Sequence, residues 1–164
     1  MTRKASSIGG RRRAARVAAV QALYQMEING GDPDDVVAEF VAYRLSDEAR
    51  QAAIDLDLFA DIVRGATAGK AKADEHIGAV LDKDRSIGRL EVIMRAILRA
   101  GAYELMARDD IDAALTISEY VAVADAFFNE REPALVNAVL DRLARRLDAG
   151  RGAADSDHGI AQDG

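Results

Sequence analysis

Four arginines within six residues form the highest concentration of like charge in the chain. They are Arg11, Arg12, Arg13 and Arg16, and they stand at the head of an apolar segment with helical periodicity. Residues 1–16 carry six basic side chains and no acidic one, whereas the remainder carries 16 basic and 28 acidic side chains. Because like charges repel, such clustering is typical of a segment that binds a polyanion or an acidic partner. The pattern predicts a nucleic-acid-binding arm.

The alternative is that these arginines are the solvated start of a helix without a ligand. Charge alone does not separate the two interpretations. Cations are, however, unfavourable at the start of a helix, where the helix dipole is positive. Arginine also suits phosphate better than lysine, because its planar guanidinium donates two parallel hydrogen bonds.

Composition favours an all-α protein and excludes several kinds of chemistry. Alanine, leucine, arginine and glutamate dominate, there are two prolines, and aromatic residues make up only 5%. The absence of cysteine excludes disulfides, thiolate metal sites and cysteine nucleophiles. No nucleotide-binding glycine motif or serine-nucleophile motif occurs. We therefore predict that the protein is not an enzyme and has no cofactor.

The candidate metal ligands are isolated from one another. His76 lies in a predicted helix and His158 near the C-terminus, and neither has a partner at ligand spacing. Pairs of acids without further oxygen ligands are better explained as solvated helix ends; these pairs are Asp55/Asp57, Asp82/Asp84 and Asp109/Asp110. We predict no metal site.

The sequence also gives expectations about location. No apolar run approaches the roughly 18 residues that a membrane span requires. Residues 1–26 are basic and acid-free, as in a transit peptide, but Val20–Tyr24 continue the same segment as a folded core helix. We expect a cytoplasmic protein that does not bind a membrane.

Helical periodicity organises the chain into one domain, residues 11–148. Residues 1–10 are expected to be a flexible arm, and residues 149–164, rich in Gly, Ala, Asp and Ser, a disordered tail. Six helices are predicted, or seven if the fourth is split near Gly88. Their ranges are about 11–28, 34–45, 54–80, 90–108, 112–128 and 136–147.

Two local features of these helices are expected from spacing. The first helix is predicted to bury a stripe of Val17, Val20, Tyr24 and Ile28, with its arginines beside that stripe. The helix over 112–128 has two candidate starts. Thr116–Glu119 fits a capping box, and Asp112 competes with it as the N-cap.

Three blocks of sequence, in the same order and spacing, resemble the NusB family of bacterial transcription antitermination factors. The similarity extends over about residues 11–147. The blocks are Arg12–Arg16 followed by Val20–Tyr24, Ile97–Arg99 with Ala102–Leu105, and Ile117–Val121 followed after a turn by Val136–Asp141.

The resemblance implies a fold and a function. NusB-like proteins are all-helical, with two packed helical bundles, and bind boxA RNA of ribosomal RNA transcripts through an arginine-rich motif. They do so together with NusE, a small-subunit ribosomal protein, in an RNA polymerase antitermination complex that reads through terminators. Arg12, Arg13 and Arg16 match the motif, Arg11 is an added neighbour, and Arg99 matches an arginine of the family's RNA surface.

One position departs from the family pattern. Leu135 stands where relatives often have an aromatic residue that contacts RNA, and leucine cannot stack on a base. Either the affinity is lower here, or Arg131 and neighbouring aromatic residues compensate. Asn137 and Tyr103 are expected to be structural, the first hydrogen-bonded within the bundle and the second a core residue with its hydroxyl near the surface.

Two other functions remain open at this point. The arginines of a purely protein-binding helical adaptor would meet an acidic partner instead of RNA. RNA cytosine methyltransferases also carry a NusB-like module, although this chain contains neither a cysteine nor a cofactor-binding α/β half. The sequence does not determine the oligomeric state, and a homodimer is allowed.

Overall fold

The structure is a computed structural model that describes residues 8–128 and 131–158, and only the backbone of residues 153–158. All regular elements in this part of the chain are helical, as predicted. The α-helices are α1 (Ile8–Asn29), α2 (Pro33–Arg44), α3 (Glu48–Ala52), α4 (Leu56–Ala68), α5 (Lys70–Val80), α6 (Val92–Ala107), α7 (Ala113–Phe127) and α8 (Glu132–His158), and a 3₁₀ turn, η1 (Ile87–Arg89), precedes α6.

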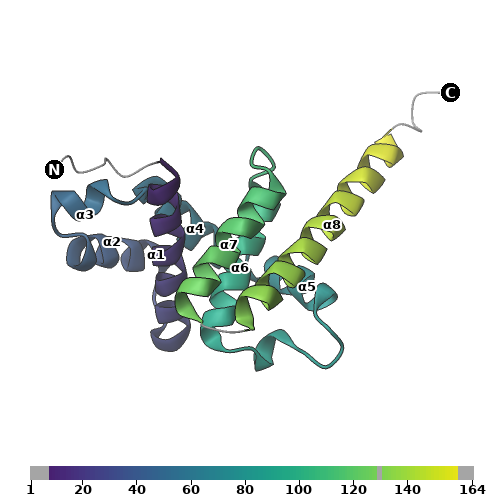
Figure 1. Cartoon of the computed structure of the whole chain (residues 1–164), viewed down its shortest axis with the longest axis horizontal. Coiled ribbons are helices and arrows are strands. Elements are labelled where there is room, and N and C mark those ends of the chain that lie inside the picture. The colour runs from purple at the N-terminus through teal and green to yellow at the C-terminus, as the bar shows by residue number, and fades with distance from the viewer. Residues whose placement is uncertain (1–7, 129–130, 159–164) are drawn as a thin grey trace.

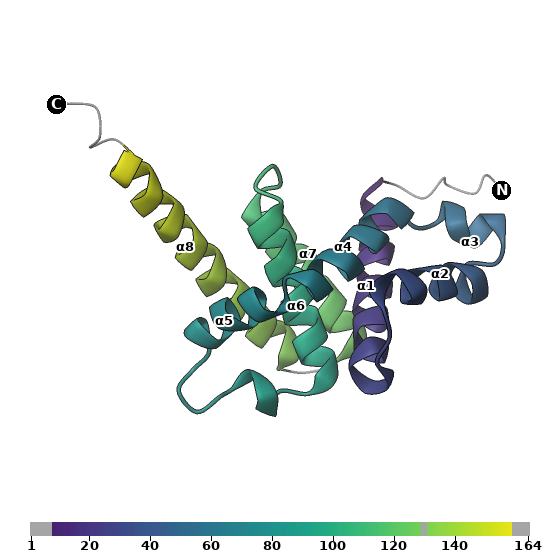
Figure 2. The ribbon, with the colours of Figure 1, turned by 180° about the vertical axis from the view of Figure 1, so that it is seen from behind.

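The helices form two bundles that share one core, which confirms the predicted architecture. Helices α1, α2 and α4 pack together in the first bundle, and α5, α6, α7 and α8 in the second (Figure 1). Contacts of α1 and α4 with α6 join the bundles, so that their buried side chains form one continuous hydrophobic cluster. The view from behind shows α4 and α5 running in succession across the back of α6 (Figure 2).

The helix count exceeds the prediction for two local reasons. A turn at Gly69 divides the helix expected over 54–80 into α4 and α5, although Gly69 N–H still donates to Gly65 O at 2.9 Å. The short helix α3 lies between predicted helices. Asp47 begins it by accepting a hydrogen bond from Arg50 N–H at 2.7 Å, which is the usual role of an N-cap.

The buried face of α1 differs from the predicted stripe. Val20 is buried as expected, but Tyr24 is 40% and Ile28 is 55% exposed. The face is instead made mainly of small residues, which allow α4 and α6 to approach α1 closely; the buried alanines are Ala15, Ala18, Ala19 and Ala22. The spacing of bulky residues therefore predicted the wrong buried face for α1.

Three helix ends differ from the sequence-based boundaries. Asp112 is the N-cap of α7, accepting from Ala114 N–H at 3.3 Å, and Thr116 is buried one turn later, so the capping box is wrong. Helix α1 begins at Ile8, within the predicted arm. Helix α8 continues to His158, through the predicted start of the tail, and projects from the bundle (Figure 1). Residues 1–7 and 159–164 lie outside the described residues.

Close approach of α6 to α8 requires the absence of a side chain at Gly101. A Cβ at this position would lie 2.8 Å from Leu140 Cδ1 and 3.4 Å from a ring carbon of Tyr120. Both neighbours are fully buried and have no free space to move into.

Gly101→Ala is expected to lower the free energy of unfolding by about 1–3 kcal/mol, because it overpacks the contact between α6 and α8. Gly78→Ala is the matched control, since Gly78 lies inside α5 with no atom within 4 Å of a Cβ. The control should be neutral or stabilising by up to about 1 kcal/mol. Urea denaturation of both variants tests this, and equal effects would contradict the packing argument.

Candidate nucleic-acid interface

The four arginines of the sequence pattern occupy the first turns of α1, but their environments differ. Arg11, Arg12 and Arg13 are exposed, whereas Arg16 is only 4% exposed. We call these four residues the arginine-rich turn. It lies at the upper end of α1 in Figure 1, and Arg12 shares a cavity lining with Ile111 of the connection between α6 and α7.

Arg16 is a buried residue with a bidentate carboxylate partner. Its Nε and Nη2 each donate to the carboxylate of Glu104 on α6, both at 2.9 Å, and Glu104 is fully buried. The Tyr120 hydroxyl on α7 donates to the same carboxylate, and the guanidinium lies 6.0 Å from the centre of the Tyr120 ring. These contacts join α1 to α6 and α7.

The charges in this cluster stabilise one another. Burial opposes the charged guanidinium, but the hydrogen bonds and charge of Glu104 keep the pKa of Arg16 above its ordinary value. Burial and the neighbouring carboxylate raise the pKa of Tyr120 well above its ordinary value, so its hydroxyl remains a donor. The sequence predicts an RNA contact for Arg16, but the structure shows its guanidinium engaged inside the protein.

Arg13 is exposed but also paired. Its Nε and Nη2 donate to Glu119 on α7 at 3.1 and 3.0 Å, and the Arg13 side chain remains 55% exposed. The hydrogen bond from Arg13 holds the pKa of the Glu119 carboxyl below its ordinary value. Arg13 therefore presents part of its guanidinium to solvent while the rest is bound to an ionised acid.

Arg11 and Arg12 are the open cations of the turn. Neither side chain makes a hydrogen bond or ion pair with another residue that the structure describes. The Arg11 carbonyl accepts from Asp55 N–H at 3.1 Å, which fixes the turn against the start of α4. Arg12 lines a cleft of about 320 Å³ together with Arg108 and three acids, Asp55, Asp57 and Asp61.

Arg99 lies away from the arginine-rich turn, in a separate network. Its Nε and Nη2 bind Asp74 at 2.7 and 2.9 Å, and its Nη1 binds Glu27 at 2.9 Å. Glu27 is near the end of α1, about 21 Å along the helix axis from Arg13. Only 12% of the Arg99 side chain is exposed. The structure thus does not bring Arg99 together with the other predicted arginines.

The structure also shows the environments of the three other residues discussed from the sequence, Tyr103 on α6 and Leu135 and Asn137 on α8. Leu135 is half-buried and packs against the core, so its side chain serves the fold. Asn137 is exposed and its side chain makes no hydrogen bond within the described residues, which contradicts the expected bond inside the bundle. The Tyr103 hydroxyl donates to Asp61 at 2.7 Å, and burial raises the pKa of Tyr103 to about 12. Tyr103 is therefore structural, as predicted.

Exposed apolar side chains, which the sequence reasoning did not identify, fall into two groups. Ile8 (70% exposed) and Leu115 (51% exposed) accompany the arginine-rich turn: Leu115 lines a small cavity with Arg12. Tyr24 and Ile28 lie toward the other end of α1, and Tyr43 lies on α2. Single exposed hydrophobic residues are ordinary, but groups of them mark binding surfaces.

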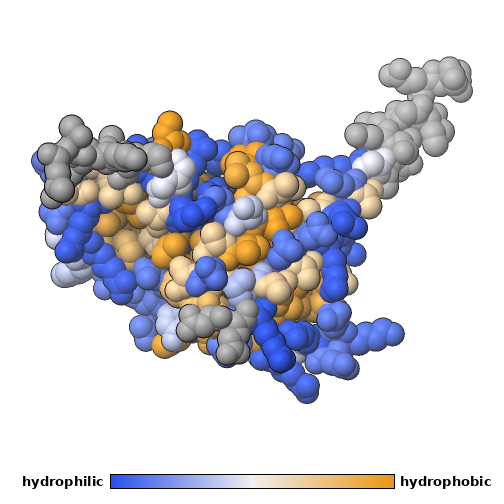
Figure 3. Space-filling model, in the orientation of Figure 1, coloured by the Kyte–Doolittle hydropathy of each residue, from blue (hydrophilic) through white to orange (hydrophobic). Residues whose placement is uncertain are grey.

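Tyr24 and Ile28 border a groove of about 570 Å³, which we call the apolar groove. Its apolar lining residues come from α1, α6 and α7 and are Tyr24, Ile28, Ile93 and Phe127. Arg44 is the one charged residue among the residues that line it. On the face shown in Figure 3, hydrophobic residues gather toward the middle of the molecule, and hydrophilic residues surround them.

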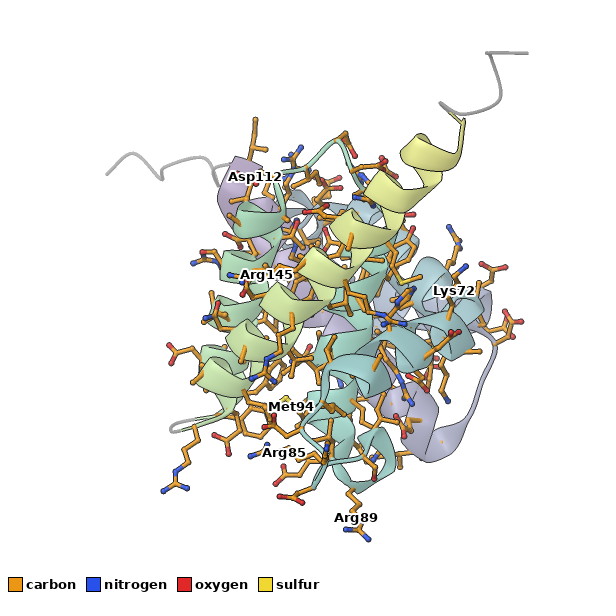
Figure 4. The ribbon with its side chains drawn as sticks, turned by 90° about the vertical axis from the view of Figure 1, so that its right-hand side faces the viewer. Lys72, Arg85, Arg89, Met94, Asp112 and Arg145 are labelled. Atoms are coloured by element: carbon orange, nitrogen blue, oxygen red, sulfur yellow. The ribbon has the colours of Figure 1, made fainter. Side chains whose placement is uncertain are left out.

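The two surfaces are separated by the length of the bundle. Figure 4 shows Asp112, which caps α7 near the arginine-rich turn, at the upper end of the molecule. It shows Met94, which follows Ile93 of the apolar groove, near the lower end. One helix, α1, carries the cations at its start and Tyr24 and Ile28 at its end.

Among the described residues, no group of three or more acidic or histidine side chains is placed to hold a metal ion. His76 accepts a hydrogen bond at Nδ1 from Arg146, at 3.2 Å. In the same part of the chain, no helix is both long and apolar enough to cross a membrane.

Comparison with known proteins identifies a family. The NusB family profile matches residues 13–145. Transcription antitermination protein NusB of Sinorhizobium fredii is 48% identical over 139 residues, covering 83% of this chain and 87% of that protein. The protein of the same name from Nitrobacter hamburgensis is 46% identical, covering 85% of this chain and 89% of its own length.

Solved structures show the same fold. T. maritima NusB superposes with a TM-score of 0.69 at 30% identity, covering 82% of this chain and 90% of that one. A NusB crystallised with NusE and double-stranded RNA gives a TM-score of 0.72 at 23% identity, covering 85% and 99%. At that identity the second comparison bears on the fold alone.

Fold and site together define a two-bundle helical protein whose first helix presents a cationic end suited to a polyanion. The family match and the sequence identities go further: the chain belongs to the NusB family of transcription antitermination proteins. Members of this family are not enzymes, which confirms the prediction of a non-enzymatic role.

The buried ion pair makes a direct prediction about stability. Arg16→Met leaves the Glu104 charge buried without its partner, and we expect a loss of about 3–5 kcal/mol in the free energy of unfolding. Adding Glu104→Gln removes that charge while keeping an acceptor for Tyr120. The double variant should therefore be more stable than Arg16→Met alone, as measured by urea denaturation. Additive losses would show that the two residues do not act as a pair.

Proposed function

We propose that the chain binds boxA RNA of ribosomal RNA transcripts together with NusE, and so promotes read-through by RNA polymerase in the cytoplasm. The observation that carries this proposal is the exposure of Arg11, Arg12 and Arg13 at one end of an otherwise acidic protein. Family membership supports it: a NusB has been crystallised with NusE and double-stranded RNA.

The exposed arginines suit a single-stranded RNA backbone. Three guanidinium groups on successive residues of one helical turn point in different directions, so they can reach phosphates along a bent strand rather than one fixed row. Unstacked bases of a single strand are free to contact nearby apolar side chains. Ile8 and Leu115 are exposed beside the turn and fit this role.

The role that we propose for each arginine depends on whether its side chain already binds a carboxylate of the protein. Arg11, Arg12 and Arg13 contact phosphates. Arg16 and Arg99, which the sequence also assigns to the RNA surface, act by holding α1 against α6, because each already binds carboxylates within the protein. Leu135 supports α8 by packing on the core and leaves base contacts to other residues.

The salt dependence of RNA binding tests this assignment. Two or three phosphate contacts predict a slope of log K against log salt of about −1.4 to −2.1, at roughly −0.7 per contact for single strands. Replacing Arg11, Arg12 and Arg13 by alanine should abolish most of the slope and lower boxA affinity at least tenfold, about 1.4 kcal/mol, with helicity intact. Fluorescence titrations at several salt concentrations measure both quantities.

A matched control removes three arginines from another surface. Arg142, Arg145 and Arg146 lie on α8, where Figure 4 shows Arg145 on the outer side of the helix. Their replacement by alanine changes the net charge equally and should leave most of the slope unchanged. If both triple variants lose affinity to the same extent, general charge rather than the arginine-rich turn governs binding.

A joint complex requires a second surface, and we propose that the apolar groove binds NusE. The groove lies at the other end of α1, so RNA on the arginines would leave it accessible. Its lining is mainly apolar, which is typical of the centre of a protein–protein interface. The relative crystallised with both NusE and RNA supports a protein partner of this kind.

Ile28→Glu is expected to prevent capture of purified NusE, because it places a charge on the apolar lining, while boxA affinity without NusE changes less than twofold. Ile28 is 55% exposed, so the fold should tolerate the change. Ala79→Glu, at an exposed position of α5, is the control and should retain NusE. If Ile28→Glu loses self-association but still binds NusE, the groove is a homodimer interface. If Ile28→Glu binds NusE and self-associates as before, the groove is not the NusE-binding surface.

A further inference from the structure

An acidic side chain lies against the cations that would bind RNA. Glu119 extends from α7 to the arginine-rich turn, where its two carboxylate oxygens each accept a hydrogen bond from Arg13. One of these oxygens is also 3.9 Å from Nη1 of Arg16. The Glu119 side chain is only 15% exposed, so the carboxylate is held between the two helices.

Arg13 does not itself need this pair. Arg16 already has a bidentate partner in Glu104, and the Arg13 side chain is 55% exposed to water. The group that the pair neutralises is the largely buried carboxylate of Glu119. The main consequence of the pair is electrostatic, because it occupies two donors of a cation at the proposed RNA surface.

An RNA phosphate must compete with Glu119 for those donors. The carboxylate binds in the same fork geometry, with two parallel hydrogen bonds, that a phosphate would use. Neither Arg11 nor Arg12 donates to a carboxylate within the described residues, although Arg12 lines a cleft with Asp55, Asp57 and Asp61. Arg11 and Arg12 can therefore bind phosphate directly, whereas Arg13 can bind phosphate only after it breaks its pair with Glu119.

We infer that Glu119 is a specificity-determining residue that withholds Arg13 from phosphate unless the RNA makes further favourable contacts. This inference rests on the proposed function and adds a cause of selectivity to it. Any polyanion gains binding free energy from Arg11 and Arg12. Only an RNA that is also held by contacts to its bases and to the partner protein gains enough binding free energy to displace Glu119 from Arg13. Penalties against wrong ligands are a general source of specificity.

Glu119→Gln tests the inference. Glutamine keeps the size of the side chain and one acceptor for Arg13 but removes the charge that holds the guanidinium. Affinity for a scrambled single-stranded RNA should rise about threefold to tenfold, the range of a partly exposed ion pair. The slope of log K against log salt for the scrambled RNA should become steeper by about 0.7, the value of one added phosphate contact. The ratio of boxA to scrambled affinity should fall.

Two controls separate this effect from a change in net charge or fold. Asp82, on the loop after α5, pairs with Arg142 of α8 at 3.3 Å, far from the arginine-rich turn. Asp82→Asn removes this acid and should change the affinity for scrambled RNA less than twofold and leave its salt slope unchanged. In an Arg13→Gln background, Glu119→Gln should have no effect, because the two residues act through one contact. Thermal unfolding of each variant verifies the fold.

The outcomes distinguish this inference from the proposed function. Unchanged or weaker binding of scrambled RNA by Glu119→Gln would overturn the inference, and weaker binding would show that Glu119 orients Arg13 toward phosphate. A rise of equal size in Asp82→Asn would also overturn it, because net charge would then explain the result. If the Arg11, Arg12 and Arg13 variant binds RNA normally, the proposed function itself fails.

Discussion

The buried ion pair between Arg16 and Glu104 is the interaction on which the cationic surface depends. Two charges removed from water are stable only when their hydrogen-bonding groups are satisfied, and the fork of Arg16, the carboxylate of Glu104 and the hydroxyl of Tyr120 meet that condition. The pair therefore fixes the rotation and height of α1 against α6 and α7. Because a helix is rigid over one turn, the positions of Arg12 and Arg13 are fixed with it.

Helix α1 connects two surfaces of different chemistry without requiring a conformational change. Its arginines lie at its start and Tyr24 and Ile28 toward its end, while alanines between them are buried against α4 and α6. A stiff element in a shared core keeps the distance between two bound ligands constant. On the proposed function, RNA and NusE would bind this chain in either order, each on a surface that exists before the other ligand binds.

The sequence was sufficient for the fold class and the family, because both depend on local periodicity and short blocks of residues. It was insufficient where the outcome depends on distant contacts. Arg12 and Arg16 are one turn apart and alike in sequence, yet only Arg16 meets Glu104, 88 positions away, and is buried. Likewise, the bulk of Tyr24 suggested the core, but the tight contact with neighbouring helices selected the alanines, and Tyr24 remained 40% exposed.

The same long-range contacts change how an arginine-rich motif should be interpreted. Counting residues gives four cations, but Glu104 neutralises Arg16 completely and Glu119 binds Arg13 in part, which leaves Arg11 and Arg12 open. The acidic remainder of the chain therefore does more than repel bulk nucleic acid. Two of its carboxylates bind these arginines: Glu104 on α6 fixes the orientation of α1, and Glu119 on α7 occupies Arg13. On our inference, Glu119 reduces the binding of nonspecific polyanions, so selectivity would depend on the paired acids as much as on the arginines.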